Sequence, residues 1–535
     1  MTIEEIIEEP VLEAPAEPAS SGLVGAAAII GIGNVASRIL GLVRETVIAY
    51  LFGATGYVSV FRVAATLIQT LYDFLVGGMV SAALVPVFSD FAARENRQEL
   101  WRVASVVINV LAVALALAVL VLEIFAPQLV WILGSGYDPA LQDAAVQMVR
   151  LILPAVFFLG LSGVITGLLY SLKRFTYPAF TTAAYNLGIV VVALALSPVF
   201  GITSLIVGIL IGAALQVILQ LPGLRDMHYR FAIDFRHPAL RRILRLYVPV
   251  VAGLSISVVG VAIDRNLASH TGAQSLAWMQ DATVLVQFPL GLVATAISFA
   301  ILPELSRQSA VAGLQSSGVT TALSSNFQPT LAFGIKLVLL LILPAATGLF
   351  VLAHPIVGLL FEHGAFTPND TLMTATALRF YLIGLPFAAI DQPLVFAFYS
   401  RKNTLAPNLV AFAGVAIYLV VALALIQSYG MIGLVVANSA QLTGHALIML
   451  WLTQTRLGGL GRQGVAALLA KSLLASAIMG AVAMVVLSAL GHAARVGQVI
   501  VPAFAAGAVY VALLRLLRVR EAERVWQIVW SRVRR

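Results

Sequence analysis

The feature that most constrains this chain is its series of long apolar stretches. About fourteen of them, each roughly 20 residues long, follow one another along the sequence, and a stretch of that length crosses a bilayer as one α-helix. Of the 535 residues, 60% are hydrophobic and only 10% are charged. Strands of a membrane barrel would instead give short segments of alternating hydrophobicity. The sequence therefore predicts an all-α polytopic membrane protein with about 14 transmembrane helices.

Hydropathy places the ends of the predicted spans to within a few residues. The predicted spans are 23–51, 57–89, 101–125, 146–172, 178–200, 203–222, 245–269, 279–304, 331–353, 372–399, 407–428, 431–453, 465–489 and 496–518.

Basic residues gather on one side of these predicted spans. The loops after even-numbered spans and the C-terminal tail hold 23 of the 32 lysines and arginines, whereas the opposite loops hold one clear case, Arg495. The positive-inside rule then predicts that both termini are cytoplasmic. Much of the net charge of +8 is therefore topological, and nucleic acid is not an expected partner.

The two ends of the chain differ from the apolar region between them. Residues 1–22 are acidic and rich in proline and alanine, which predicts a disordered tail. Residues 519–535 are predicted to form a basic amphipathic tail on the membrane surface. The chain contains no cysteine, which excludes disulfides, zinc–thiolate sites and thiol catalysis.

Two pairs of short motifs indicate an internal repeat. "YSLKRFTYP" (170–178) matches "YSRKNTLAP" (399–407), and "AALVPVFS" (82–89) matches "FAILPELS" (299–306). Six spans separate the copies, so both enter the membrane in the same direction, as in many transporters. A channel or a scaffold could keep the same trace of duplication. The predicted organisation is an N-lobe (23–222), a cytoplasmic linker (223–244), a C-lobe (245–453), two further spans (465–518) and a cavity between the lobes.

Several charged residues fall inside the predicted spans. Each costs at least about 2.5–3.5 kcal/mol at the bilayer centre, so it should face a cavity or a partner. One interpretation is a set of structural ion pairs, and the other is a basic cavity for an anion, because guanidinium binds phosphate through paired donors. The set comprises Arg38, Arg44 and Glu45 in span 1, Arg62 and Asp73 in span 2, and Asp264 and Arg265 in span 7.

Other charged residues lie nearer the span ends, where their side chains are expected to reach the interface. They are Glu123, Asp281, Asp391 and Lys471. Motifs for nucleotide hydrolysis (GxxxxGK[ST]) and zinc binding (HExxH) are absent from the sequence. We therefore expect no cofactor, and coupling to the membrane potential or to an ion gradient is the physical default.

The motifs of this chain resemble those of the MurJ (MviN) lipid II flippase family, which belongs to the multidrug/oligosaccharidyl-lipid/polysaccharide (MOP) exporter superfamily. The resemblance covers about residues 30–455, in order. It is carried by "SRILGLVRE" with "LFGA", "SAALVPVFSDF", "SLKRFTYPAFTTAAYN", "LQVILQLPGL", "QFPLGLVATAISFAILPELSR", "LFEHGAFTPND" and "FYSRKNTLAP".

This resemblance implies a V-shaped fold of fourteen helices in the bacterial cytoplasmic membrane. It implies a transporter, not an enzyme, which moves lipid II from the inner to the outer leaflet by alternating access and so supports cell-wall synthesis. Lipid II and membrane lipids are the implied partners, together with the cell-wall synthesis machinery. The resemblance implies functional first-span arginines at Arg38 and Arg44, with Glu45 as the neighbouring acidic residue. From the intramembrane charges, the predicted substrate site also includes Arg62 and Arg265, with Glu45, Asp73 and Asp264 as charge partners.

The chain also departs from the family pattern. Arginines that are common in spans 2 and 8 are replaced here, and Arg62 and Arg265 are hypothesised to supply the missing charge. The departures are Ser59, Tyr72, Asp73, Gly77 and Val284. They leave open a MOP-type exporter of another lipid-linked oligosaccharide or of a small molecule, and also a membrane glycosyltransferase or a non-transporting scaffold.

Overall fold

The computed structural model describes residues 21–93, 97–315, 326–491 and 493–523, and every regular element in those ranges is a helix. The first half contains α1 (Ser21–Phe52), α2 (Gly56–Tyr72), α3 (Val85–Ala92), α4 (Arg97–Ile124), α5 (Ala126–Gly134), α6 (Pro139–Ile152), α7 (Pro154–Ser171), α8 (Thr176–Ala179), α9 (Thr181–Phe200) and α10 (Thr203–Gln220). The remainder contains α11 (Pro238–Ser269), α12 (Ser275–Pro289), α13 (Ala296–Gln315), α14 (Phe327–Val351), α15 (Ala353–Leu360), α16 (Pro368–Ser400), α17 (Leu405–Tyr429), α18 (Met431–Arg456), α19 (Val465–Leu490) and α20 (Arg495–Leu516).

The helix lengths agree with the predicted spans. Within the described ranges, twelve helical segments are long and apolar enough to cross a membrane, or thirteen if the bent helix α11 counts as one span. Pro249 lies inside α11 and accounts for a bend there, because proline removes a helical hydrogen bond. Helix α1 adds 32 further helical residues. The all-α membrane fold with about 14 spans is thus confirmed.

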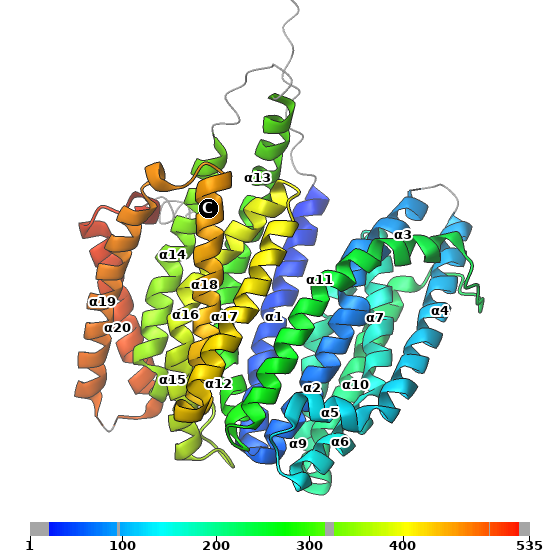
Figure 1. Ribbon diagram of the computed structural model, residues 1–535, viewed down its shortest axis with the longest axis horizontal. Coiled ribbons are helices and arrows are strands. Elements are labelled where there is room, and N and C mark those ends of the chain that lie inside the picture. The colour runs from blue at the N-terminus through cyan, green and yellow to red at the C-terminus, as the bar shows by residue number, and fades with distance from the viewer. Residues whose placement is uncertain (1–20, 94–96, 316–325, 492, 524–535) are drawn as a thin grey trace, which may run out of the picture.

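The helices form two groups with two helices between them (Figure 1). Helices α2 to α10 form one group and α12 to α18 the other, while α19 and α20 flank the second group on its outer side. Helix α1 packs mainly on α9, and α11 contacts both α5 of the first group and α17 of the second. The predicted C-lobe begins at residue 245, inside α11, but α11 contacts both groups. The lobe boundaries at 222 and 245 therefore stay a prediction.

The two copies of the sequence repeat have the same backbone. Lys173 and Lys402, 229 residues apart, both have φ of 58°, in the left-handed region. The amide of Arg174 donates to Leu169 O at 2.8 Å, and the amide of Asn403 donates to Phe398 O at 3.0 Å. These bonds close the ends of α7 and α16 as Schellman caps, in which the left-handed residue is usually glycine.

Changing Lys402 to glycine should stabilise the protein by about 1 kcal/mol, because glycine avoids the left-handed penalty. The midpoint of thermal unfolding of the detergent-solubilised protein reports the gain. Lys402→Ala is the control, since alanine removes the same charge and keeps the penalty. Equal midpoints for the two variants would show that the lysine conformation carries no cost.

The repeat also extends to irregular helical turns. The second span contains two π-helical segments, η2 (Asp73–Gly77) and η3 (Val80–Leu84), between α2 and α3. The eighth span contains one, η5 (Leu290–Thr295), between α12 and α13. Segments η2 and η5 begin 217 residues apart, the offset of the "AALVPVFS" and "FAILPELS" motifs. π-Helical turns within α-helices are frequent at functional sites.

The predicted tails lie mostly outside the described residues. The N-terminal prediction concerns 1–22, of which 1–20 are not described, and the amphipathic prediction concerns 519–535, of which 524–535 are not. In the part that is described, Val519 is buried and Glu521 accepts an ion pair from Lys336 of α14 at 2.8 Å. The beginning of the tail therefore packs on the protein.

At the end away from Lys173 and Lys402, hydrogen bonds join the second group of helices to α1 and to the first group. There the amide of Ala365 donates to Tyr50 O at 2.9 Å. The amide of Ala277 in α12 donates to Ser59 Oγ in α2 at 3.2 Å. Ser59, one of the departures from the family pattern, therefore joins the two groups by a hydrogen bond. We call these contacts the seal.

Arg495, the one clear basic residue expected at the seal end, has a carboxylate partner. Its guanidinium forms an ion pair with Glu362 and donates to Gly358 O at 3.2 Å. Burial alone would raise the pKa of the Glu362 carboxyl, but hydrogen bonds from Thr371 and Arg495 hold that pKa below its usual value. The pair therefore anchors α20 to the loop that carries part of the seal.

Candidate substrate site

A buried ion network joins α1, α2 and α12. Arg62 of α2 forms ion pairs through Nη2 with Glu45 of α1 and with Asp281 of α12, the latter at 3.2 Å. The side chains of Glu45 and Asp281 are 0% and 3% exposed, so both carboxylates depend on this guanidinium. The Arg62–Asp281 pair also links the two groups of helices.

Arg44 extends this network toward α9. Its Nε donates to Glu45 Oε1 at 3.0 Å and its Nη1 donates to Asn186 Oδ1 at 2.9 Å. Asn186 in turn donates to Ser37 O at 3.1 Å, which fixes its orientation. The side chain of Arg44 remains 27% exposed, so it can reach a ligand without leaving its partners.

These arginines line a cavity of about 340 Å³ between α1, α2, α9, α10, α11 and α12. Arg44, Arg62 and Arg265 contribute to its wall, together with a single carboxylate, Asp73. The partner carboxylates Glu45 and Asp281 lie behind the wall and do not line it. The cavity therefore presents cations, and the carboxylates that compensate Arg44 and Arg62 are hidden in the protein.

Unpartnered donors strengthen this interpretation. Nε of Arg62 and Nε of Arg265 are buried and have no hydrogen-bond partner among the described residues. An unsatisfied buried donor costs about 1–3 kcal/mol, and more when it belongs to a charged group. Arg62 and Arg265 therefore keep hydrogen-bonding capacity that the described residues do not use.

Arg265 lies where two cavities meet. Its Nη1 contacts Asp264 Oδ2 at 3.3 Å and its Nη2 donates to Gln280 Oε1 at 3.3 Å. Asp264 also accepts a hydrogen bond of 2.6 Å from Tyr418 of α17. Arg265 lines both the first cavity and a second one, on the α17 and α18 side of α11, whose wall includes Asp264.

Two of the sequence-predicted site residues behave differently. Asp73 lines the first cavity but forms no ion pair among the described residues, and accepts only from Gln69 Nε2 at 3.1 Å. Arg38 does not line that cavity, and its Nη1 donates to Gln287 O near the end of α12 at 3.2 Å. The structure thus brings Arg44, Arg62 and Arg265 together and leaves Arg38 apart. Binding of substrate by these residues stays a prediction.

The expectation that Asp281 reaches the interface is wrong. The residue is 2% exposed and neutralises Arg62 within the ion network. Sequence reasoning also missed Asn186, because a single amide inside an apolar helix gives no charge signal. For Asp281 the available signal was the absence of lysine and arginine between Arg265 and Arg307, which leaves this carboxylate without a basic partner nearby in the sequence.

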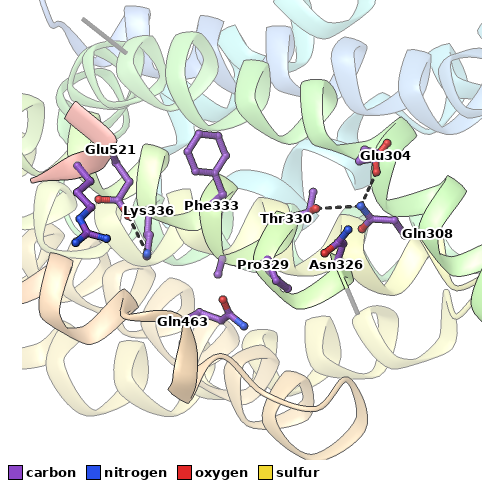
Figure 2. Close-up of a pocket in the computed structure, with 11 residues that line it drawn as sticks. Glu304, Gln308, Asn326, Pro329, Thr330, Phe333, Lys336, Gln463 and Glu521 are labelled. Carbon is purple, nitrogen blue, oxygen red and sulfur yellow. Dashed lines mark hydrogen bonds and ion pairs between the residues drawn. The ribbon is translucent and has the colours of Figure 1, made fainter. Parts of the chain in front are cut away.

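Other cavities have a different chemical character. A cavity of about 560 Å³ lies between α13, α14 and the C-terminal segment (Figure 2). Its wall mixes Lys336 and Arg520 with Glu304 and Glu521, so the charges balance. A fourth cavity, about 420 Å³, is lined only by apolar residues of α1, α12, η5, α14 and α15, including Leu42, one turn from Arg38.

The molecule has a repeated helical architecture, a seal at one end and a cationic cavity between its halves. These features are typical of membrane transporters. The family model described as "Lipid II flippase MurJ" matches residues 48–503. The lipid II flippase MurJ of Burkholderia cenocepacia is 30% identical over 385 residues, which cover 70% of this chain and 73% of that one. A probable lipid II flippase MurJ of Vibrio cholerae is 28% identical over 78% and 81% of the two chains. The chain therefore belongs to the lipid II flippase MurJ family.

Solved structures agree on the fold. A lipid II flippase MurJ in an inward closed conformation superposes with a TM-score of 0.77 and 24% identity, covering 91% of this chain and 98% of that one. An inward-facing multidrug resistance MATE family transporter of the MOP superfamily gives a TM-score of 0.64 and 14% identity, covering 81% and 95%. The expected MOP-type architecture is thus confirmed.

Proposed function

We infer that this chain translocates lipid II from the inner to the outer leaflet of the bacterial cytoplasmic membrane and so supports cell-wall synthesis. Membership of the lipid II flippase MurJ family supports this inference. The observation that carries the inference to a site is the cavity whose wall holds three arginines, while Glu45 and Asp281, the partner carboxylates of Arg44 and Arg62, lie behind it.

The proposed headgroup site is formed by Arg44, Arg62 and Arg265. A pyrophosphate offers planar pairs of oxygens that match the guanidinium fork. It would also compete with Glu45 and Asp281 for Arg62, so that binding weakens the link between the two groups of helices.

The proposed cycle is alternating access. The seal closes one end of the molecule, and the basic loops mark the other end, which faces the cytoplasm together with both termini. The headgroup enters from that side, and the apolar cavity beside Arg38 suits the first part of the lipid tail. The groups then rock against each other, which opens the seal and exposes the headgroup outside.

A second candidate is a MOP-type exporter of another lipid-linked oligosaccharide. The observation that favours it is Asp73, a carboxylate that faces the cavity without an ion-pair partner among the described residues. A carboxylate at that place suits a headgroup with fewer negative charges.

Complementation tests the proposed function. The wild type should rescue bacteria depleted of their own lipid II flippase, and Arg44→Ala should not, because it removes the most exposed cavity guanidinium. Glu45 keeps Arg62 as its partner in this variant, so the fold should persist. Arg379→Ala is the matched control, since Arg379 lies outside the cavity wall and donates to Phe350 O.

Each outcome of this experiment has a distinct meaning. Failure of a wild type that is inserted at normal levels would contradict lipid II as the substrate and favour the second candidate. Rescue by both wild type and Arg44→Ala would support the flippase and exclude an essential role for Arg44.

A further inference from the structure

The second cavity contains a histidine–carboxylate pair at membrane depth. His445 lies near the middle of α18, and its Nδ1 is 2.9 Å from Asp391 Oδ1 of α16. Asp391 was expected to reach the interface, yet it lies nine residues before the end of α16, about 13 Å into the helix. The side chains are 17% and 19% exposed, and His445 lines the cavity of about 340 Å³.

Charge makes this pair unusual within the protein. Among the described residues, Asp391 forms no ion pair with lysine or arginine, so His445 is the only partner that can carry a compensating positive charge, when its ring is protonated. If His445 is neutral, an ionised Asp391 is uncompensated inside the membrane, which is costly. One bound proton removes this cost, either as imidazolium beside carboxylate or as imidazole beside carboxylic acid.

Ionisable groups on the surrounding helices have other partners. On α11, Asp264 and Arg265 face the same cavity and pair with each other. Tyr418 of α17 donates its hydroxyl to Asp264, and Tyr399 lies two turns along α16 from Asp391. Charged side chains on α12, α13 and α14 are engaged elsewhere, in Arg62–Asp281, Glu304–Arg307 and Lys336–Glu521.

The space around the ring is shaped by a glycine. A Cβ added to Gly414 of α17 would lie 3.6 Å from His445 Cδ2, so the imidazole packs directly against the backbone of that helix. The His445 ring thus touches α17 and α16 and opens into a cavity bounded by α11. A change in the charge of the ring therefore affects the packing between α18, which carries it, and α11, α16 and α17.

We propose that His445 and Asp391 bind the proton whose inward movement drives the transport cycle. The proposal rests on the proposed function, because it supplies that transporter with its coupling ion. The proton is taken from water when the cavity opens outward, is held by the pair while the cavity is closed, and returns to water on the cytoplasmic side. Histidine is suited to this role because it ordinarily changes charge between pH 5 and 8.

The first test follows the conformation of the full chain without any substrate. Because the sequence has no cysteine, spin labels can be attached to Ala93→Cys and Thr455→Cys, two exposed positions at the basic end of the two groups of helices. In nanodiscs, the distribution of distances between the labels should shift by about tenfold in population between about pH 5.5 and pH 8. His445→Gln and Asp391→Asn should each remove this response.

His228→Gln is the matched control, because His228 is exposed in the loop before α11 and should leave the response intact. A wild-type distribution that does not change with pH would overturn the proposal. The same pH response in His445→Gln would also overturn it, and so would a response to sodium at constant pH in place of the response to protons.

The second test joins the proton to transport. Proteoliposomes that contain lipid II and an internal pH dye, with the membrane potential clamped, should show inward proton movement together with lipid II translocation. His445→Gln should lose the proton signal. Translocation by the wild type without proton movement would overturn the coupling and leave the proposed function standing. A pH response in nanodiscs without lipid II translocation would instead retain the proton site and contradict the proposed substrate.

Discussion

Replacing Arg62 with alanine is expected to abolish transport and to destabilise the protein by about 3–5 kcal/mol. The change leaves Asp281 without a cationic partner and leaves Glu45 with Arg44 alone, although both carboxylates are buried. It also removes the ion pair that links the two groups of helices and one wall of the proposed headgroup site. Translocation of lipid II in proteoliposomes and the midpoint of thermal unfolding report the two losses.

A second variant separates these two effects. The triple change Glu45→Gln, Arg62→Met and Asp281→Asn removes all three charges, and a buried ion network replaced by neutral groups often costs little stability. Its unfolding midpoint should return close to that of the wild type, whereas transport should remain absent. Wild-type transport by either variant would contradict a role for Arg62 in the headgroup site.

Changing Gly364 to alanine should break the seal. Gly364 has φ of +62°, and a Cβ added there would lie 2.2 Å from the carbonyl oxygen of Tyr50. The backbones of the loop and of α1 can then no longer approach, and the hydrogen bond from Ala365 to Tyr50 should be lost. A single cysteine placed at Ala54, a buried residue next to Gly53, which lies against Ala365, should react about tenfold faster with an impermeant maleimide.

Gly201 provides the control for this experiment. It has φ of +52° but nothing within 4 Å of an added Cβ, so Gly201→Ala introduces similar backbone strain without a clash. It should leave the labelling rate of the cysteine at position 54 unchanged. Equal rates for the two variants would show that backbone strain, and not the contact between the loop and α1, controls access at this end.

The spans could be predicted because each depends on a local property, the length of an apolar stretch. The repeat could also be predicted, since the same caps require the same short motifs, as at Lys173 and Lys402. The pairing of charges could not. Arg62 and Asp281 are 219 positions apart and Arg44 and Asn186 are 142 apart, so their contacts depend on how whole helices pack.

The face of α1 illustrates the same limit. Arg38 and Glu45 are seven residues apart and share a helix face, whereas Arg44 points about 120° away from Arg38. In the structure Glu45 nevertheless pairs with Arg44, because long side chains on adjacent residues can turn toward each other, and Arg38 reaches α12. Helical periodicity fixes the direction of Cβ but not the place of a guanidinium four bonds further out.

The π-helical segments η2 and η5 indicate the order in which the two halves of the protein evolved. A π turn corresponds to one residue inserted into an α-helix, which shifts the face of everything that follows by about 100°. Both copies of the repeat carry this shift at positions 217 residues apart, whereas η3 has no described counterpart in the eighth span. The simplest genealogy is that the shared insertion arose once in an ancestral half, before its gene was doubled, and that η3 arose afterwards in one descendant only.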